Sequence, residues 1–422
     1  MKATIVPARV REAPTAVLFY LVGIFILGFT MDGGIFPVLQ NLYLLRLGYG
    51  PEFVGIFNSL GLLIFALLSL PIGTIQRWPH RRLLLLGLTL IVLGMFGVPL
   101  AQWGPTAWQA GWLLAAHVLS YVGLSFFFVH SAPFLLSITV GDWQNRALAW
   151  QSATLAVAGF SGGLLAGYLP GWIAIKLSLS TEHPTPYQYP LFLAAGVLLF
   201  AFFVFGRMPE PVLEAMNPTE TTVSSRMSKV AQWSGSLWVF ILLLLVVRML
   251  QVAAPGAILT FANVYLDDGL HIATDRIGMM TAVGKLASVP IALLTPHILN
   301  KWGNFKVVIW ISLISLIAAL PLALTSNWQL AGVGYALASG AGPLRYLSFL
   351  VFTLSMVPPQ RRALVSGAGE MAIGLGFALM AFIGGYLIEA YGYSLFFGIS
   401  LGITLIGTSL FWGIFRRFRQ TI

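Results

Sequence analysis

Twelve apolar runs in the sequence are each long enough to cross the hydrocarbon core of a membrane, which takes about 20 helical residues. Because lipid cannot hydrogen-bond the backbone, every peptide group in such a run must be paired within its own segment, so α-helices are predicted. With 58% hydrophobic and 9% charged residues, the chain is too apolar for a soluble domain of 422 residues. We therefore predict an all-α membrane protein with spans at residues 16–44, 53–76, 83–102, 107–137, 147–175, 190–206, 236–266, 276–299, 306–325, 329–356, 363–389 and 393–415.

The two halves of the chain repeat each other. Residues 30–44, TMDGGIFPVLQNLYL, return 222 positions later as VAAPGAILTFANVYL, so that Asn41 corresponds to Asn263. A period of about half the chain predicts two structural repeats that run in the same direction. Asp32 has no copy, because its equivalent is Ala254.

A long polar stretch divides the twelve runs into two groups of six. It covers residues 207–235 and is rich in Pro, Glu, Thr and Ser. We predict an N-terminal six-helix bundle over residues 1–206, a linker over residues 207–235 and a C-terminal six-helix bundle over residues 236–422. The two bundles are expected to be related by pseudo-symmetry, because the sequence repeats.

The distribution of Lys and Arg predicts the orientation in the membrane. If the N-terminus is cytoplasmic, seventeen of these residues lie in cytoplasmic segments, and only Arg46, Lys176 and Arg276 lie on the other side. Basic residues gather on the cytoplasmic side of membrane proteins. We therefore predict a multi-pass protein of the plasma membrane with both termini and the linker in the cytoplasm.

The signatures of several other functional classes are missing from the sequence. There is no cysteine, which excludes disulfides and thiolate chemistry. The net charge of +10 comes from basic residues scattered between apolar runs, so nucleic-acid binding is not expected. A nucleophile paired with a base, a metal motif such as His-Glu-x-x-His and a nucleotide-binding P-loop are also missing. We therefore expect neither an enzyme nor an ATP-driven pump, and no cofactor or metal.

The stretch from Ile72 to Arg81 covers the end of the second apolar run and the loop after it, and the basic cluster His80-Arg81-Arg82 stands at its end. Together with the twelve-span plan and the internal repeat, it resembles the major facilitator superfamily, whose members carry Gly-x-x-x-Asp-Arg-x-Gly-Arg-Arg between helices 2 and 3. The acid of this motif, which braces the cytoplasmic gate in the family, is replaced by Gln76 in the first copy and Asn300 in the second. The resemblance implies a gating motif formed by Gln76, Arg77, Arg81, Arg82, Lys301 and Gly303.

The resemblance also implies an arrangement of helices and a type of activity. In the family, spans 1, 4, 7 and 10 line a central cavity with help from spans 2, 5, 8 and 11, while spans 3, 6, 9 and 12 face outward. Members are secondary transporters that move solutes by alternating access, often as monomers. The implied partners are a small-molecule substrate, protons and the lipid bilayer.

The fifth apolar run carries glycines at every fourth position, at Gly159, Gly163 and Gly167. This spacing lets two helix backbones approach closely in a membrane. It also resembles the antiporter motif Gly-x-x-x-Gly-Pro-x-x-Gly-Gly, with Leu164 in the Pro place and Tyr168 in place of the last Gly. Both interpretations remain open, and the second favours an efflux branch of the family.

Ionisable residues inside apolar runs are costly in lipid and mark bundle interiors or water-filled paths. Spans 3, 6, 9 and 12 have none in their interiors, which is the distribution that a central cavity requires. The ionisable residues inside spans are Asp32, His117, His130, Arg248, Lys285, Arg345 and Glu370.

The fourth span contains two histidines, His117 and His130, which are thirteen positions apart. At ~100° per residue they lie on different faces of a helix, so at most one is expected to face the cavity and His130 is expected to be structural. In the same span, Tyr121 occupies the place of a family Gly. Lys285 lies well inside span 8, where it can face the cavity or extend toward the lipid interface.

Three of the charged residues suggest how a substrate is held. Arg345 and Glu370 are within side-chain reach, so a structural ion pair is one interpretation of both. Arg248 lies near mid-depth of a cavity span, has Ile26 as its repeat equivalent, and is the best candidate for a substrate contact. The spans hold three cations and two carboxylates, and an unpaired buried cation is costly. We therefore hypothesise a substrate with an acidic group that meets Arg248.

Asp32 is the expected proton-coupling group. It lies past the middle of the membrane on span 1, and no lasting partner is expected for it, since Arg248 is nearer the cytoplasm. Without a fixed partner, Asp32 can gain and lose a proton as the cavity alternates between the two sides. Alternatively, Asp32 only ties the Gly33-Gly34 segment by hydrogen bonds. Glu370 is the second coupling candidate.

These features predict a secondary active transporter that moves a small organic solute, coupled to protons and in the direction of export. The alternatives are a proton-coupled uptake symporter and a lipid or glycolipid flippase of the same fold. A receptor without transport activity would not need charges in a cavity. The predicted substrate-binding residues are Arg248, Arg345, His117, Lys285 and Tyr121.

Overall fold

The computed structural model describes residues 13–73, 75, 78–139, 142–208, 237–357 and 362–416. Within these ranges the chain forms fifteen α-helices and no strand, and the helices combine into twelve membrane spans. The predicted all-α fold with twelve membrane helices is therefore confirmed. Most of the predicted linker, and the motif residues Gln76 and Arg77, lie outside the described residues.

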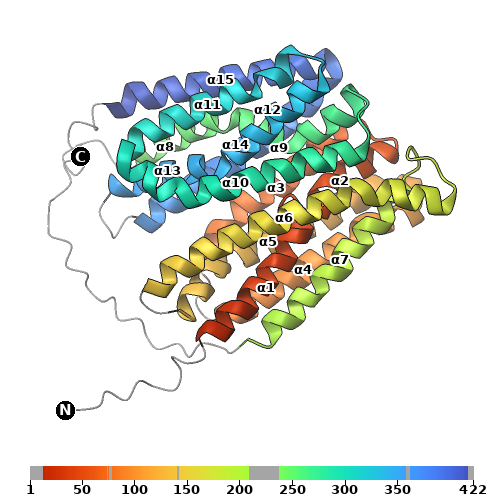
Figure 1. Cartoon of the computed structure of the whole chain (residues 1–422), viewed down its shortest axis with the longest axis horizontal. Helices are drawn as coiled ribbons and strands as arrows, with labels where there is room; N and C mark the ends of the chain where they lie inside the picture. The colour runs from red at the N-terminus through yellow and green to blue at the C-terminus, as the bar shows by residue number, and fades with distance from the viewer. Residues whose placement is uncertain are drawn as a thin grey trace.

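Helices of the same half lie mainly beside one another, and those of the C-terminal half occupy the upper part of Figure 1. The N-terminal half contains α1 (Ala13–Met31), α2 (Ile35–Arg46), α3 (Pro51–Gly73), α4 (His80–Leu100), α5 (Thr106–Ser137), α6 (Asp142–Leu177) and α7 (Thr185–Gly206). The C-terminal half contains α8 (Leu237–Gln251), α9 (Ala253–Val264), α10 (Thr274–Trp302), α11 (Asn304–Leu324), α12 (Trp328–Gly340), α13 (Gly342–Ser355), α14 (Arg362–Tyr391) and α15 (Tyr393–Phe415).

Three of the predicted spans are not single helices, because each is broken into two. The first span breaks between α1 and α2, where Gly33 has φ +71°, a backbone conformation that favours glycine. The seventh span breaks at Val252 and the tenth at Ala341. Pro255 and Pro343 follow these two breaks, and a proline removes the backbone donor that would continue the helix across the break. The breaks in spans 1 and 7 lie beside the cavity described below.

The two halves pack together mainly through α6 against α10 and through α3 against α14. Glycines make this close approach possible: a methyl group added at Gly278 of α10 would lie 2.5 Å from the Cα atom of Gly167 of α6. On the other side of the molecule, a methyl group at Gly55 of α3 would lie 3.0 Å from the Cα atom of Gly385 of α14. The structural interpretation of the α6 glycines is thus supported by direct packing.

The two halves lie close at one end of the molecule and diverge toward the other (Figure 1). We call the first the outer end; it holds the end of α2 and the start of α7. The inner end is where α1 begins and α15 finishes. The sequence predicts that the inner end faces the cytoplasm.

Candidate functional site

A cavity of about 420 Å³ lies between the two halves. The N-terminal half contributes residues of α1, α2, α3 and α5 to its lining, and the C-terminal half contributes residues of α8 to α15. Spans 9 and 12 were expected to face outward only, yet α11 contributes Ser312 and Ser315 and α15 contributes Thr404. Spans 9 and 12 therefore also contribute polar side chains to the lining.

Asp32 and Lys285 form an ion pair on the wall of this cavity. Lys285 Nζ donates a hydrogen bond to Asp32 Oδ1 at 2.7 Å, and the side chains are 26% and 42% exposed for Lys285 and Asp32 respectively. The expectation that Asp32 lacks a fixed partner is therefore wrong. The sequence did not predict this ion pair, because the two residues lie 253 positions apart and belong to different halves of the chain.

Two glycines of the N-terminal half make room for the Lys285 side chain. A methyl group at Gly33 would overlap with Lys285 Cε, and one at Gly159 would lie 3.3 Å from Lys285 Cδ. Asp32 lies in the break after α1. A methyl group at Gly159 would also overlap with the backbone carbonyl oxygen of Asp32. The first glycine of the α6 motif therefore lies beside the ion pair itself.

The two histidines of α5 face different surroundings, as their spacing predicts. His117 lines the cavity, and its ring lies 3.7 Å from the Phe57 ring and 4.7 Å from the Tyr121 ring, measured between centroids. Tyr121 also lines the cavity. His130 instead has its Nδ1 atom 3.0 Å from Nδ1 of His80, away from the cavity lining. Only His117 of the two is thus placed to contact a solute.

Arg345 lines the cavity, whereas Arg248 lies behind its wall. Arg248 is 3% exposed, and its guanidinium carbon lies 4.0 Å from the centre of the Phe349 ring. Among the described residues, Glu370 does not form the expected ion pair with Arg345 and instead accepts a hydrogen bond from the Tyr346 hydroxyl at 2.6 Å. Tyr346 follows Arg345 directly on α13, and its side chain points in a different direction. The carboxylate of Glu370 therefore bonds to Tyr346 and not to Arg345. Arg248 can therefore support this cluster but does not reach the cavity in this conformation.

Neutral polar side chains complete the lining, and the sequence-based prediction missed them. Gln251 is 1% exposed, and neither atom of its amide group has a hydrogen-bond partner among the described residues. Such a group is costly to bury unless something binds it, so Gln251 can donate to and accept from a solute. The feature that could have identified Gln251 as a cavity residue is its position directly before the break in span 7.

The repeated asparagines of the two halves also reach the cavity. Asn41 donates to the Thr260 carbonyl of the other half at 3.0 Å and accepts from Asn58 at 3.0 Å. In the second half, Asn263 lies 3.5 Å from the Thr281 hydroxyl in the equivalent arrangement. The repeat therefore marked two polar positions of the site, although the sequence did not indicate their role.

The predicted gating motif is described only in part. Arg81 donates from Nε to the Phe205 carbonyl at 3.2 Å and also donates to the Gly206 carbonyl, which ties the start of α4 to the end of α7. Gly303 separates α10 from α11 with φ +76°. Lys301 lies 5.9 Å from the ring centre of its neighbour Trp302. Arg82 lies in the first turn of α4, next to Arg81.

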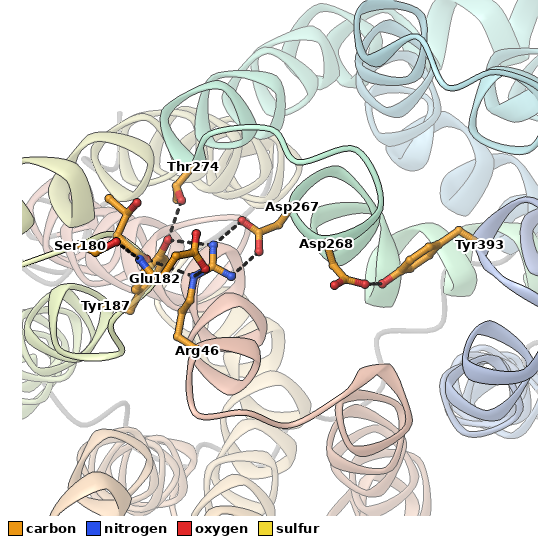
Figure 2. Close-up of polar contacts among 9 residues, drawn as sticks. Arg46, Ser180, Glu182, Tyr187, Asp267, Asp268, Thr274 and Tyr393 are labelled. Atoms are coloured by element: carbon orange, nitrogen blue, oxygen red, sulfur yellow. Dashed lines mark hydrogen bonds and ion pairs between the residues drawn. The ribbon is translucent and has the colours of Figure 1, made fainter.

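A second polar network lies at the outer end (Figure 2). Arg46, at the end of α2, binds both carboxylate oxygens of Asp267, at 2.6 and 2.8 Å. The Tyr187 hydroxyl of α7 lies 2.9 Å from the Thr274 hydroxyl of α10. Both contacts join the N-terminal half to the C-terminal half, so the outer end of the molecule is bridged by polar bonds.

A cavity thus lies between the two repeated halves, and the breaks in the first and seventh spans lie beside it. The sequence profile of the Major Facilitator Superfamily matches residues 18–342 and 256–420. The chain belongs to the Major Facilitator Superfamily. It is therefore a membrane transporter for small molecules and not an enzyme.

The superfamily includes curated relatives of similar length. The Multidrug resistance protein MdtG of Citrobacter koseri is 25% identical over 387 residues, which cover 87% of this chain and 86% of the relative. The protein of the same name from Salmonella typhimurium is 24% identical over 316 residues, which cover 71% of this chain and 72% of the relative.

Solved structures show the same fold at lower identity. A D-xylose-proton symporter superposes with a TM-score of 0.70 at 12% identity, over 94% of this chain and 96% of that chain. A bacterial homologue of the human lysosomal transporter Spinster, in an inward-facing and unoccupied conformation, superposes with a TM-score of 0.69 at 14% identity, over 99% of both chains. These superfamily members establish the fold and leave substrate and direction open.

Proposed function

We propose that this transporter exports small organic solutes from the cytoplasm in exchange for protons, and that Asp32 carries the proton. The ion pair between Asp32 and Lys285, 2.7 Å long and placed on the cavity wall, carries this proposal. It joins the two halves, so the charge of one carboxylate affects how the halves are held together. The name of the MdtG relatives, a multidrug resistance protein, supports the export of organic solutes.

Exchange requires that the proton and the solute occupy the site at different times. When Asp32 is ionised, it attracts Lys285 or a cationic or hydrogen-bonding group of a solute. When Asp32 is protonated, it has no charge with which to attract either group. Binding of the solute and binding of the proton are therefore negatively coupled through one carboxylate. Gln251, His117 and Tyr121 would contact the rest of the solute from the same cavity.

Symport of an acidic solute is the second candidate function, because the cavity lining also favours anions. Lys285 and Arg345 both line the cavity, whereas Asp32 is its one carboxylate among the described lining residues. An anionic group at Lys285 would leave Asp32 without its cationic partner, and a proton would then neutralise it. Solute and proton would move together. The acidic-substrate hypothesis thus rests on Lys285 and Arg345, with Arg248 and Glu370 behind them, in place of a direct contact with Arg248.

The direction of proton movement separates the two candidates. Purified protein in liposomes would be supplied with a gradient of ethidium, an organic cation, or carboxyfluorescein, an organic anion, while an enclosed pH indicator follows protons. The membrane potential is clamped with potassium and valinomycin. Exchange predicts that protons move opposite to ethidium, whereas symport predicts that protons accompany carboxyfluorescein. Solute movement without proton movement contradicts both, and movement of a fluorescent lipid instead supports a flippase.

A further inference from the structure

Two ion pairs among the described residues connect the halves of the chain: Asp32–Lys285 in the cavity and Arg46–Asp267 at the outer end. Arg46 ends α2, and Asp267 lies in a turn of π-helix, Tyr265–Gly269, that follows α9. We propose that Arg46 and Asp267 form a latch that closes the outer end of the transport path and opens once in each transport cycle. Opening of the latch requires only alternating access, and it is independent of the substrate and of the coupling ion.

The contact between the two side chains has the geometry of a specific link. The guanidinium of Arg46 donates from Nη1 to one carboxylate oxygen of Asp267 at 2.6 Å and from Nη2 to the other at 2.8 Å. Such paired hydrogen bonds between ionised groups are stronger and more directional than single neutral ones. The Arg46 side chain is 12% exposed and that of Asp267 is 5% exposed, so water competes little for the bond while the outer end is closed.

The N-terminal half orients Arg46 toward the other half. Arg46 Nε donates to the Thr181 carbonyl at 3.1 Å, and the guanidinium carbon lies 5.3 Å from the centre of the Tyr187 ring. Tyr187 itself contacts Thr274 of the C-terminal half through its hydroxyl. Figure 2 shows these side chains gathered around Arg46 on one side and Asp267 facing it from the other. One rigidly placed cation therefore meets one carboxylate across the boundary.

The internal repeat places opposite charges at equivalent positions near the outer ends of the two repeats. The offset of 222 residues places Arg46 opposite Asp268, so equivalent positions of the two repeats carry opposite charges. Asp268 points away from Arg46 and accepts a hydrogen bond from Tyr393 of its own half at 2.7 Å, as Figure 2 shows. Asp267, the residue before Asp268, forms the ion pair with Arg46. The end of α2 is positive, and the equivalent turn of π-helix after α9 is negative. The two ends therefore attract each other across the boundary between the halves, whereas equal charges would repel.

The latch can also open, because the net free energy that the ion pair adds to the closed state is much smaller than the attraction between the two charges. The attraction between the charges is largely offset by the water that both lost on pairing, and both regain water when the halves separate. A large apolar contact has no such compensation. An ion pair at the outer end therefore holds the closed state without making it permanent.

A single reporter cysteine tests the latch. The natural sequence has no cysteine, so Ile258→Cys adds one thiol on α9, where Ile258 lines the cavity and is 7% exposed. A membrane-impermeant maleimide applied to the outer face reaches this thiol only when the outer end opens. The rate of labelling is measured without solute or proton gradient, in the parent cysteine protein and in Arg46→Gln, Asp267→Asn and the charge reversal Arg46→Asp with Asp267→Arg. Asp268→Asn, which removes the neighbouring carboxylate, is the matched control.

The latch predicts that each single substitution at Arg46 or Asp267 raises the labelling rate by roughly tenfold, as expected for losing one charged hydrogen-bonded pair. The charge reversal should bring the rate back toward the parent value, and Asp268→Asn should leave it unchanged. Labelling of the same thiol in denaturing detergent gives the total reactive thiol of each variant, and a single symmetric gel-filtration peak confirms that each variant is folded. Rates within twofold of the parent for both single substitutions overturn the latch. A charge reversal that labels as fast as the single variants shows that the pairing of charge is not what closes the outer end.

Discussion

Asp32 forms an ion pair with Lys285 on the cavity wall, and the proposed proton coupling depends on this pair. Its lack of a copy in the second repeat, where Ala254 stands, identified it as a candidate functional residue. Lys285 was also identified, as an ionisable residue inside a span, but not as the partner of Asp32. The 2.7 Å contact depends on Gly33 and Gly159, which leave room for the lysine side chain between the two halves. Neighbours of that kind cannot be inferred from a single position.

Asp32→Asn should separate solute exchange from proton coupling. Asparagine keeps the shape and most of the hydrogen bonding of aspartate, but it cannot carry a charge or exchange a proton. We expect the variant to exchange a transported probe across vesicles and to lose its accumulation under a pH gradient. Glu370→Gln, which alters the carboxylate bound by Tyr346, is the control that should still accumulate the probe. Accumulation at the wild-type level in Asp32→Asn would assign the coupling role to Glu370 or a histidine.

At the scale of elements, the glycines of α6 explain how two helices from different halves meet. Gly163 and Gly167 face α10, where a methyl group at Gly278 would lie 2.7 Å from the Gly163 carbonyl oxygen. The spacing of four residues predicted a close helix contact but not its partner. The partner is α10, the helix that carries Lys285. The contact between α6 and α10 therefore also determines where along the membrane normal Lys285 meets Asp32.

Gly278→Leu should therefore impair transport more than an equally large change elsewhere. The added side chain would force α6 and α10 apart, and the closed outer end would no longer form. We expect the initial rate of probe transport to fall at least roughly tenfold, since small residues let these helix backbones touch. Gly171→Leu, in α6, is the control, because nothing lies within 4 Å of a methyl group there. Equal transport rates in the two variants, at equal amounts of folded protein, would show that the contact is dispensable.

At the scale of the whole molecule, the Arg46–Asp267 ion pair and the contact between Tyr187 and Thr274 join the two halves at the outer end. The halves meet near Arg46 and Asp267 and diverge toward the start of α1 (Figure 1). The outer end lies on the outside of the cell if the predicted orientation holds. The orientation therefore decides which step of the cycle this conformation represents.

Thiol labelling in intact cells tests the orientation. A cysteine at Glu220, in the predicted cytoplasmic linker, should react with a membrane-impermeant reagent only after the cells are opened. A cysteine at Glu182, whose side chain is 77% exposed at the outer end, should react in intact cells. The absence of native cysteine removes any background. Labelling of the Glu220→Cys protein from outside would reverse the predicted topology.

The sequence alone determined the membrane-helical class, the number of spans and the family, because these depend on local hydrophobicity and on a repeat that can be read along the chain. It also located Asp32, His117, Lys285 and Arg345 among the residues that line the cavity. Only the tertiary structure decided which charges pair. Arg248 turned out to stack on Phe349 behind the cavity wall, and Asp32 turned out to bind a lysine from the other half. Contacts across the two halves depend on helix rotation, on helix breaks and on the glycines that let backbones approach, and no single segment encodes these together.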